Sequence, residues 1–267
     1  MLTKFPIEAQ LYPELTTIDV GDNLIESLDK SIGNHPALQN LLIAHNRLKG
    51  IHPNIDKLVD LRKLHLPFNQ LSDIPSTLSD LRNLEYINLV ENNFTEISPS
   101  ICRITTLLDL RISHNKLEQV SPNIGQLHLL QRLNLENNNL VTLPDLFGNM
   151  YSITFLNLGS NLLEKLPETF WNLTHLTVLD ISNNKLNMLP TGLGMCEKLN
   201  NFEFHDNPFG SIPQEIESAG AGVMLRYLKQ LFLASPPPGM EDVPGIWDGK
   251  TNKLILEGFH LLQVSSC

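Results

Sequence analysis

Apolar and polar residues alternate along this chain in a pattern that repeats every 23 residues. Each of nine copies contains the segment L-x-x-L-x-L-x-x-N, as at residues 61–69. With the first Leu of a copy as position 1, positions 1, 4, 6, 11, 14, 18 and 21 are apolar, and His35 is the only exception. Position 9 is always asparagine: Asn23, Asn46, Asn69, Asn92, Asn115, Asn138, Asn161, Asn184 and Asn207. An unbroken period of this length is typical of solenoids, whose stacked repeats share one continuous core.

Positions 3 to 7 of each copy predict a short strand. Alternation with period two places positions 4 and 6 inward, and successive strands are expected to pair into a parallel sheet on the concave face of a curved solenoid. The asparagine at position 9 is expected to turn inward and satisfy backbone groups that the turn leaves unpaired. Proline at position 15 favours turns or 3-10 segments over a full helix on the convex return; it occurs as Pro75, Pro144, Pro167, Pro190 and Pro213. The predicted fold class is therefore an α/β solenoid.

The end of the array carries a different period, which predicts a capping helix near residues 222–233. Apolar side chains stand there at helical spacing: Met224, Leu225, Leu228, Leu231 and Phe232. A helix in this place would shield the core of the last repeat, as the terminal elements of solenoids must.

Both ends of the chain depart from the full repeat. Residues 2–12 fit positions 11 to 21 of a repeat that lacks its strand and its asparagine. The Pro-Pro-Pro-Gly run at 236–239 is typical of a linker. Residues 254–264 fit L-x-L-x-x-N-x-L-x-x-V, with Phe259 in place of the asparagine.

These features predict three parts. An array at 1–233 holds nine full repeats, a partial first repeat and the capping helix. A linker follows at 234–253, and residues 254–267 form a partial degenerate repeat or the start of a second block. This layout predicts a fragment or isoform of a longer protein.

Charge and cysteine usage narrow the class of protein. The formal net charge of −10 argues against a general nucleic-acid surface, and no apolar run approaches the roughly 18 residues of a membrane span. The first residues lack the basic-then-apolar pattern of a signal peptide. Three cysteines, Cys102, Cys196 and Cys267, make no disulfide framework. We expect a cytoplasmic protein without membrane insertion.

The sequence carries no motif for catalysis, a metal or a cofactor. Its nine histidines form no His-Glu-x-x-His and the cysteines no Cys-x-x-Cys, and no phosphate-cradling glycine loop or nucleophile elbow is present. We therefore expect neither an enzyme nor a cofactor.

The outward strand positions 3, 5 and 8 supply the candidate binding residues. The middle repeats carry a mixed basic and aromatic patch: Lys63, His65, Phe68, Tyr86, Arg111, His114, Arg132 and Phe155. Acidic residues stand at the two ends: Asp19, Asp22, Asp180, Glu203 and Asp206. Tyr and Arg are enriched among residues that dominate binding energy at interfaces. The alternative is that these side chains only solvate the sheet face.

The consensus LxxLxLxxNxLxxLPxxLxxL, carried by residues 2 to about 233, resembles the leucine-rich-repeat family and its intracellular 23-residue group, to which Ras-suppressor, SHOC-type and Roco arrays belong. The resemblance implies a scaffold or adaptor that binds a protein partner on its concave face, in small-GTPase or phosphatase signalling. Two alternatives stay open: a targeting module of a larger enzyme such as a Roco-type kinase, and a fragment of a recognition receptor. Self-association through the uncapped N-terminal edge is a further expectation.

Overall fold

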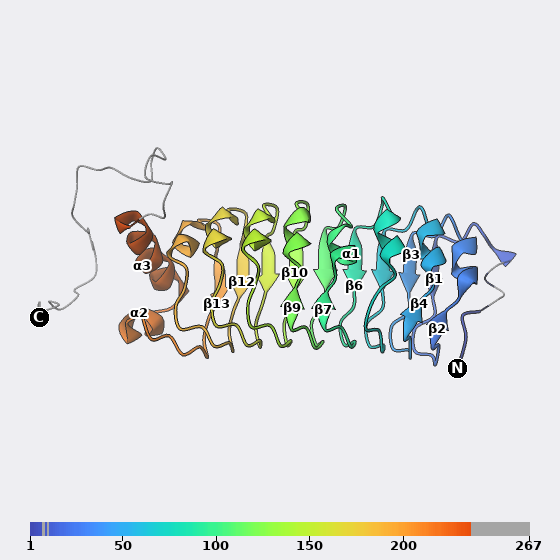
Figure 1. Ribbon diagram of the computed structural model, residues 1–267, viewed down its shortest axis with the longest axis horizontal. Helices are drawn as coiled ribbons and strands as arrows, with labels where there is room; N and C mark the ends of the chain where they lie inside the picture. The colour runs from blue at the N-terminus through green and yellow to red at the C-terminus, as the bar shows by residue number, and fades with distance from the viewer. Residues whose placement is uncertain (7–8, 10, 236–267) are drawn as a thin grey trace, which may run out of the picture.

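The computed structural model describes residues 1–6, 9 and 11–235. The predicted degenerate repeat at 254–267 and the linker from residue 236 onward lie outside the described residues, so the proposed division of the chain stays a prediction. Within the described part, the repeats stack along one long axis from the N-terminal end to helix α3 (Figure 1).

A nine-stranded parallel sheet runs the length of the stack, with every strand beside the strand of the next repeat. Each strand holds three residues at positions 3 to 5: β1 (Thr17–Asp19), β3 (Asn40–Leu42), β5 (Lys63–His65), β6 (Tyr86–Asn88), β8 (Asp109–Arg111), β10 (Arg132–Asn134), β11 (Phe155–Asn157), β12 (Val178–Asp180) and β13 (Asn201–Glu203). The register is constant, because a period without insertions sets Lys63 beside Tyr86 and Tyr86 beside Asp109. Equivalent side chains therefore form straight columns across the sheet.

The central residue of each strand points into a single continuous core. Leu64, Ile87 and Leu110 are fully buried, and the same cluster extends from Phe5 to Leu228. Burial of this aliphatic surface is the main favourable term in folding. No repeat could achieve it alone, since each one covers only its neighbours.

Each repeat leaves its strand through one residue in the left-handed region at position 8. The φ angles there lie between 51° and 56°, and none of the nine residues is glycine: Asp22, His45, Phe68, Glu91, His114, Asn137, Ser160, Asn183 and Asp206. Left-handed backbone is uncommon for such residues, so the surrounding structure must enforce it. This turn directs the following asparagine inward.

The position-9 asparagines form a hydrogen-bonded ladder. The Asn115 side chain donates to the carbonyls of Leu89, Ile112 and Ser113, and its Oδ1 accepts from the Phe94 N–H at 3.0 Å. The rungs from Asn69 to Asn207 repeat this arrangement one period apart, whereas Asn23 and Asn46 each donate to two carbonyls. Leu2 completes the first rung by donating to Asn23 Oδ1 at 2.7 Å.

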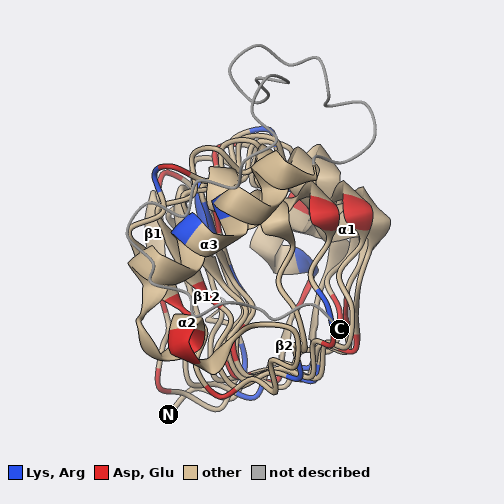
Figure 2. Cartoon of the chain, turned by 90° about the vertical axis from the view of Figure 1, so that its left-hand side faces the viewer, with Lys and Arg blue, Asp and Glu red and all other residues tan. Residues whose placement is uncertain are grey.

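The convex return consists mainly of five-residue 3-10 helices: η2 (Lys30–Asn34), η3 (Pro53–Lys57), η4 (Ser76–Asp80), η5 (Pro122–Gln126), η6 (Asp145–Asn149), η7 (Glu168–Asn172) and η8 (Thr191–Met195). The fourth repeat has a short α-helix instead, α1 (Pro99–Cys102). Figure 2, viewed along the stack, shows β1 and β12 on one side of the coil and β2 and α1 on the other.

Two additional strand pairs lie on the return: β2 (Ser27–Leu28) with β4 (Gly50–Ile51), and β7 (Glu96–Ile97) with β9 (Gln119–Val120). Each pair has a hydrogen bond from a position-15 N–H, from His52 to Leu28 and from Ser121 to Ile97. Proline, which occupies position 15 in five repeats, has no N–H to give. The repeats with proline accordingly lack these strands.

Two helices close the C-terminal end: α2 (Gln214–Ser218) and α3 (Ala221–Ala234). Met224, Leu228 and Phe232 of α3 are buried, and α3 packs on η8 (Figure 1). The close approach requires Gly194, because a Cβ there would lie 2.6 Å from the Lys229 Cα. The predicted α/β solenoid, with its concave parallel sheet, 3-10 return and capping helix, is confirmed.

Two further residues, His35 and Cys102, are fully buried. His35, the one polar residue among the inward positions, makes an edge contact with Phe5 at 6.2 Å between ring centroids. Burial lowers the pKa of His35, and a hydrogen bond with the Tyr12 backbone offsets part of this decrease. Cys102 lies on the convex return, one residue beyond the inward Ile101 of α1, and is also fully buried.

Candidate functional site

The middle of the concave sheet carries an aromatic and cationic cluster built around Tyr86. Lys63 Nζ lies 5.0 Å from the centre of the Tyr86 ring and Arg111 Cζ lies 5.2 Å from it. His65 stacks at 6.2 Å between ring centroids, and its Nδ1 is 3.5 Å from the Tyr86 hydroxyl. The constant register brings these residues together, since they occupy positions 3 and 5 of neighbouring strands.

Asp109 connects this group to the next strand, and it was not among the predicted binding residues. Arg111 Nη2 donates to Asp109 Oδ2 at 2.8 Å, and Arg132 Nε lies 3.7 Å from the same oxygen. The Arg132 guanidinium lies over the Phe155 ring at 4.2 Å. We call the set Lys63, His65, Tyr86, Asp109, Arg111, Arg132 and Phe155 the central cluster. The sequence did contain a signal for Asp109. It lies two residues before Arg111 in one strand and directly opposite Arg132 in the next strand.

The remaining two predicted residues, Phe68 and His114, belong to the position-8 turns. Phe68 stacks on His45 with ring centroids 4.3 Å apart and an interplanar angle of 9°. His114 Nδ1 lies 2.7 Å from Asn137 Nδ2 and 3.7 Å from Glu91 Oε1. The predicted patch is therefore divided between the strands and the turns that follow them. His45 is a contact of Phe68 that the patch did not include.

Charge in the central cluster is net positive. Burial, and then Lys63 and Arg111, lower the pKa of His65, so its imidazole is neutral near pH 7. The hydrogen bond to Asp109 raises the pKa of Arg111, which stays charged. Three cations thus face one carboxylate. Acidic side chains lie at the two ends of the same sheet face, with Asp19 on β1 and Glu203 on β13.

The described residues contain no group of three or more His, Cys, Asp or Glu side chains placed to hold a metal ion. Burial raises the pKa of Cys102 and of Cys196 to about 12, so neither thiol is a thiolate near neutral pH. No helix among the described residues is long and apolar enough to cross a bilayer.

Comparison with known families identifies the fold. The Leucine rich repeat model matches residues 13–71, 36–94 and 128–186, together more than half of the chain. The chain belongs to the leucine-rich repeat family. No curated protein matches this chain at a significant level.

Solved structures of other leucine-rich repeat proteins share this architecture. A leucine-rich repeat protein of Leptospira interrogans is 26% identical over 81% of this chain and 73% of its own, with a TM-score of 0.59. An internalin of Listeria monocytogenes is 26% identical over 74% of this chain and 57% of its own, with a TM-score of 0.66.

A third solved relative is the leucine-rich repeat ectodomain of the membrane receptor kinase GASSHO1/SCHENGEN3 from Arabidopsis thaliana, in complex with CASPARIAN STRIP INTEGRITY FACTOR 2. It is 26% identical over 76% of this chain, with a TM-score of 0.57, and this chain spans only 28% of its length. Leucine-rich repeat proteins generally mediate protein–protein interactions. This chain spans 73%, 57% and 28% of the lengths of these three relatives.

Proposed function

We propose that this leucine-rich repeat protein binds a protein partner across its concave sheet, with the central cluster as the centre of contact. The observation that carries the proposal is the placement of Tyr86, Arg111 and Arg132 on the open face of the sheet. None of them has a core role, and aromatic and arginine side chains dominate binding energy at many interfaces. The GASSHO1/SCHENGEN3 ectodomain in complex with CASPARIAN STRIP INTEGRITY FACTOR 2 is a precedent for a leucine-rich repeat array that binds a partner.

The electrostatics of the face specify the chemistry of the partner. Lys63, Arg111 and Arg132 outnumber Asp109 at the centre, so the partner is expected to present carboxylates there. Basic groups are expected toward its two ends, opposite Asp19 and Glu203. Such complementarity contributes mainly to specificity and to the rate of association.

The finer assignment is a cytoplasmic scaffold or adaptor in small-GTPase or phosphatase signalling. Its support is the resemblance to the intracellular 23-residue group, in which the layout of the chain end is similar to that of leucine-rich-repeat-containing protein forty. A targeting module of a larger Roco-type enzyme remains the first alternative.

A recognition-receptor fragment is the second alternative, and one observation favours it. One of the solved relatives is described as an ectodomain of a membrane receptor kinase. Fractionation of intact cells distinguishes the cytoplasmic adaptor from the receptor. A cytoplasmic adaptor is recovered with soluble proteins, whereas a receptor is recovered with membranes.

Affinity capture tests the concave-face proposal. The variant Arg111→Glu/Tyr86→Ala removes the ring and reverses one charge of the central cluster. The matched control, Arg103→Glu/Tyr151→Ala, changes the same residue types at exposed positions outside the sheet. We expect the wild type and the control to capture the same proteins from a lysate, and the central-cluster variant to lose them. Equal capture by the wild type, the control and the central-cluster variant would show that the partner does not bind the concave face.

A further inference from the structure

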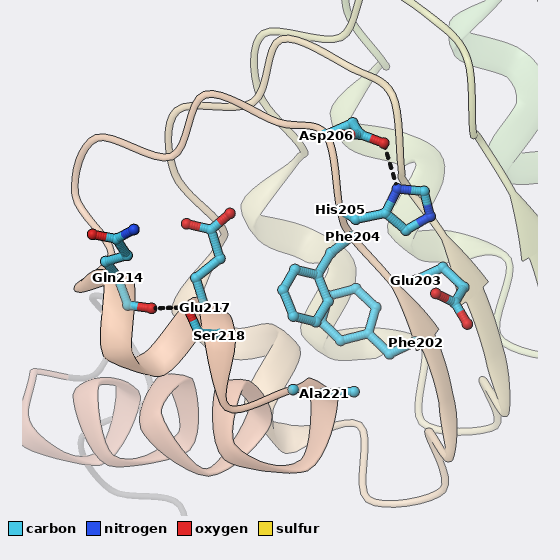
Figure 3. Close-up of a pocket in the computed structure, with 10 residues that line it drawn as sticks. Phe202, Glu203, Phe204, His205, Asp206, Gln214, Glu217, Ser218 and Ala221 are labelled. Atoms are coloured by element: carbon cyan, nitrogen blue, oxygen red, sulfur yellow. Dashed lines mark hydrogen bonds and ion pairs between the residues drawn. The ribbon is translucent and has the colours of Figure 1, made fainter.

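A pocket of about 620 Å³ lies between β13 and the capping helices (Figure 3). β13 also has an open edge, since no described residue accepts from the N–H groups of Phe204 and Asp206. The two aromatic rings that line the pocket, those of Phe202 and Phe204, are nevertheless buried already, because the cap covers them. A ligand would therefore bury little further apolar surface at this edge.

Phe68, by contrast, is an exposed aromatic residue in a strained turn. It occupies position 8 of the third repeat with φ of 55°, and the other eight residues at this position in the described repeats are all polar or charged. Left-handed backbone is a genuine outlier for a bulky side chain, and such strain occurs mainly at active sites and ligand-binding sites. The Phe68 side chain is 45% exposed, so a place in the core does not explain the phenylalanine.

The Phe68 ring has one covered face and one free face. The covered face lies on His45 of the preceding repeat, with ring centroids 4.3 Å apart and an interplanar angle of 9°. Because these two stacked rings follow the direction in which the repeats stack, the free face is directed toward the next repeat. Position 8 of that repeat is Glu91, one strand spacing of about 4.8 Å further along.

The Glu91 carboxylate has no cationic partner in the described part of the chain. Its side chain is 47% exposed, and the basic side chain next to it is that of His114, whose Nδ1 lies 3.7 Å from Glu91 Oε1. This Nδ1 accepts a hydrogen bond from Asn137 Nδ2 at 2.7 Å, because an amide nitrogen can only donate. His114 Nδ1 therefore carries no proton for Glu91, and the negative charge remains uncompensated.

We propose that Phe68 and Glu91 together form an arginine site, which binds an arginine side chain of the protein partner. The guanidinium lies over the free face of the Phe68 ring and donates to the Glu91 carboxylate. Cations are attracted to the face of an aromatic ring. A guanidinium is planar, weakly hydrated and able to form two parallel hydrogen bonds to a carboxylate, which favours arginine over lysine.

The same sheet face already holds one of its own arginines in this way. Arg132 Cζ lies 4.2 Å from the centre of the Phe155 ring, and its Nε lies 3.7 Å from Asp109 Oδ2. An aromatic ring from one repeat and a carboxylate from another thus hold a guanidinium between them. Phe68 and Glu91 repeat this pair of groups, but without an arginine of the described chain.

This inference rests on the proposed binding across the concave face and adds a cation to the chemistry of the partner. The central cluster attracts carboxylates, whereas the arginine site attracts a guanidinium. Phe68 follows His65 of the central cluster by three residues, a separation of about 10 Å along a strand. One segment of the partner can therefore reach both the central cluster and the arginine site.

A random peptide library displayed on phage and selected on the full chain provides the probe. We expect the enriched peptides to contain an arginine. In the synthetic peptide, citrulline in place of this arginine keeps the shape and removes the charge, and should weaken binding about tenfold in calorimetry. Phe68→Asn and Glu91→Gln should each weaken binding of the arginine peptide about three- to tenfold.

Two controls separate the site from general effects. The net charge of −10 attracts any arginine peptide, so Glu118→Gln, which removes the same charge at an exposed position outside the concave sheet, should leave the affinity unchanged. Phe68→Asn introduces the residue type that position 8 has at Asn137 and Asn183. Because asparagine tolerates left-handed backbone, the melting temperature should stay the same or rise.

Equal affinity for the arginine and citrulline peptides would overturn the arginine site, as would a selection that enriches no arginine peptides. A clear fall in the melting temperature of Phe68→Asn would assign Phe68 a packing role and would also contradict the proposal. Binding that is lost in Arg111→Glu/Tyr86→Ala but unchanged in Phe68→Asn would reject the arginine site alone. Binding that is unchanged in both variants would reject the concave face as well.

Discussion

The Arg111 guanidinium holds the Asp109 carboxylate through Nη2···Oδ2 at 2.8 Å and Nε···Oδ1 at 3.1 Å. The two residues are at positions 3 and 5 of one strand, so both point out of the concave face. The Asp109 side chain is only 15% exposed, since Arg111 and Arg132 cover it. The arginine is thereby fixed beside Tyr86, which reduces the conformational entropy that a partner would have to overcome on binding.

We predict that the Asp109–Arg111 pair stabilises the fold measurably. A double-mutant cycle with Asp109→Ala and Arg111→Ala should give a coupling free energy of about 0.5–1 kcal/mol, because the arginine remains well exposed to solvent. Urea denaturation provides the free energies of unfolding. The Arg62–Glu85 pair, with both side chains more exposed, is the control and should couple less. A coupling no larger than that of the control would show that the geometry contributes nothing.

The asparagine ladder predicts a large difference between two neighbouring residues. Asn138 is buried and donates to three carbonyls, while its Oδ1 accepts from the Leu117 N–H. Asn138→Ala removes these hydrogen bonds and leaves the Leu117 N–H without an acceptor, although the three carbonyls keep other donors, so it should cost about 1–3 kcal/mol of unfolding free energy. Asn139 is exposed, and Asn139→Ala should change it by less than about 0.5 kcal/mol. Similar midpoints for the two variants in urea would contradict a structural role for the ladder.

His35 predicts a dependence of stability on pH. Burial lowers its pKa in the folded state below the ordinary value of 6.5, so the unfolded chain binds the proton more readily. Stability from this residue is full above about pH 6.5 and falls as the pH decreases.

His35→Leu, which restores the residue type found at this position in the next repeat, should remove that loss and raise the melting temperature at pH 5 more than at pH 7.5. The pKa of His65 is also lowered, so a smaller dependence on pH should remain. An unchanged difference between the two melting temperatures would show that His35 does not titrate with unfolding.

The capping helix predicts a steric effect at one glycine. A Cβ at residue 194 would meet the backbone of Lys229 in α3, so Gly194→Ala should displace the helix and cost about 1–3 kcal/mol. Gly210 is the matched control, because nothing lies within 4 Å of the corresponding Cβ. Calorimetry should show a lower melting temperature for the first variant only. Equal melting temperatures would mean that α3 does not pack on η8 as described.

Much of the fold could be predicted because each repeat encodes the same local structure. The inward columns, the strand positions and the capping helix all follow from periods of two, 3.6 and 23 residues. Repeats with a proline at position 15 lack strands of the β2–β4 type. This absence could also have been predicted, since proline lacks the N–H that such a strand needs.

The candidate site was harder to predict from the sequence. Columns of outward residues predicted Tyr86, Arg111 and Arg132, but not the role of Asp109. A sequence shows which residues are neighbours across strands, but not which side chains turn toward each other. The division between the central cluster and the position-8 stack of His45 and Phe68 likewise depends on backbone φ at the turn, which the residue types alone do not indicate.

By itself, the sequence determined the solenoid, its register and its core, because hydrophobic periodicity acts locally and repeats without interruption. Only the tertiary structure decided the burial of His35 and Cys102, the Asp109 bridge between two arginines, and the open edge at β13. Each of these depends on contacts between residues far apart in sequence or on the place where stacking stops, and a local pattern contains neither.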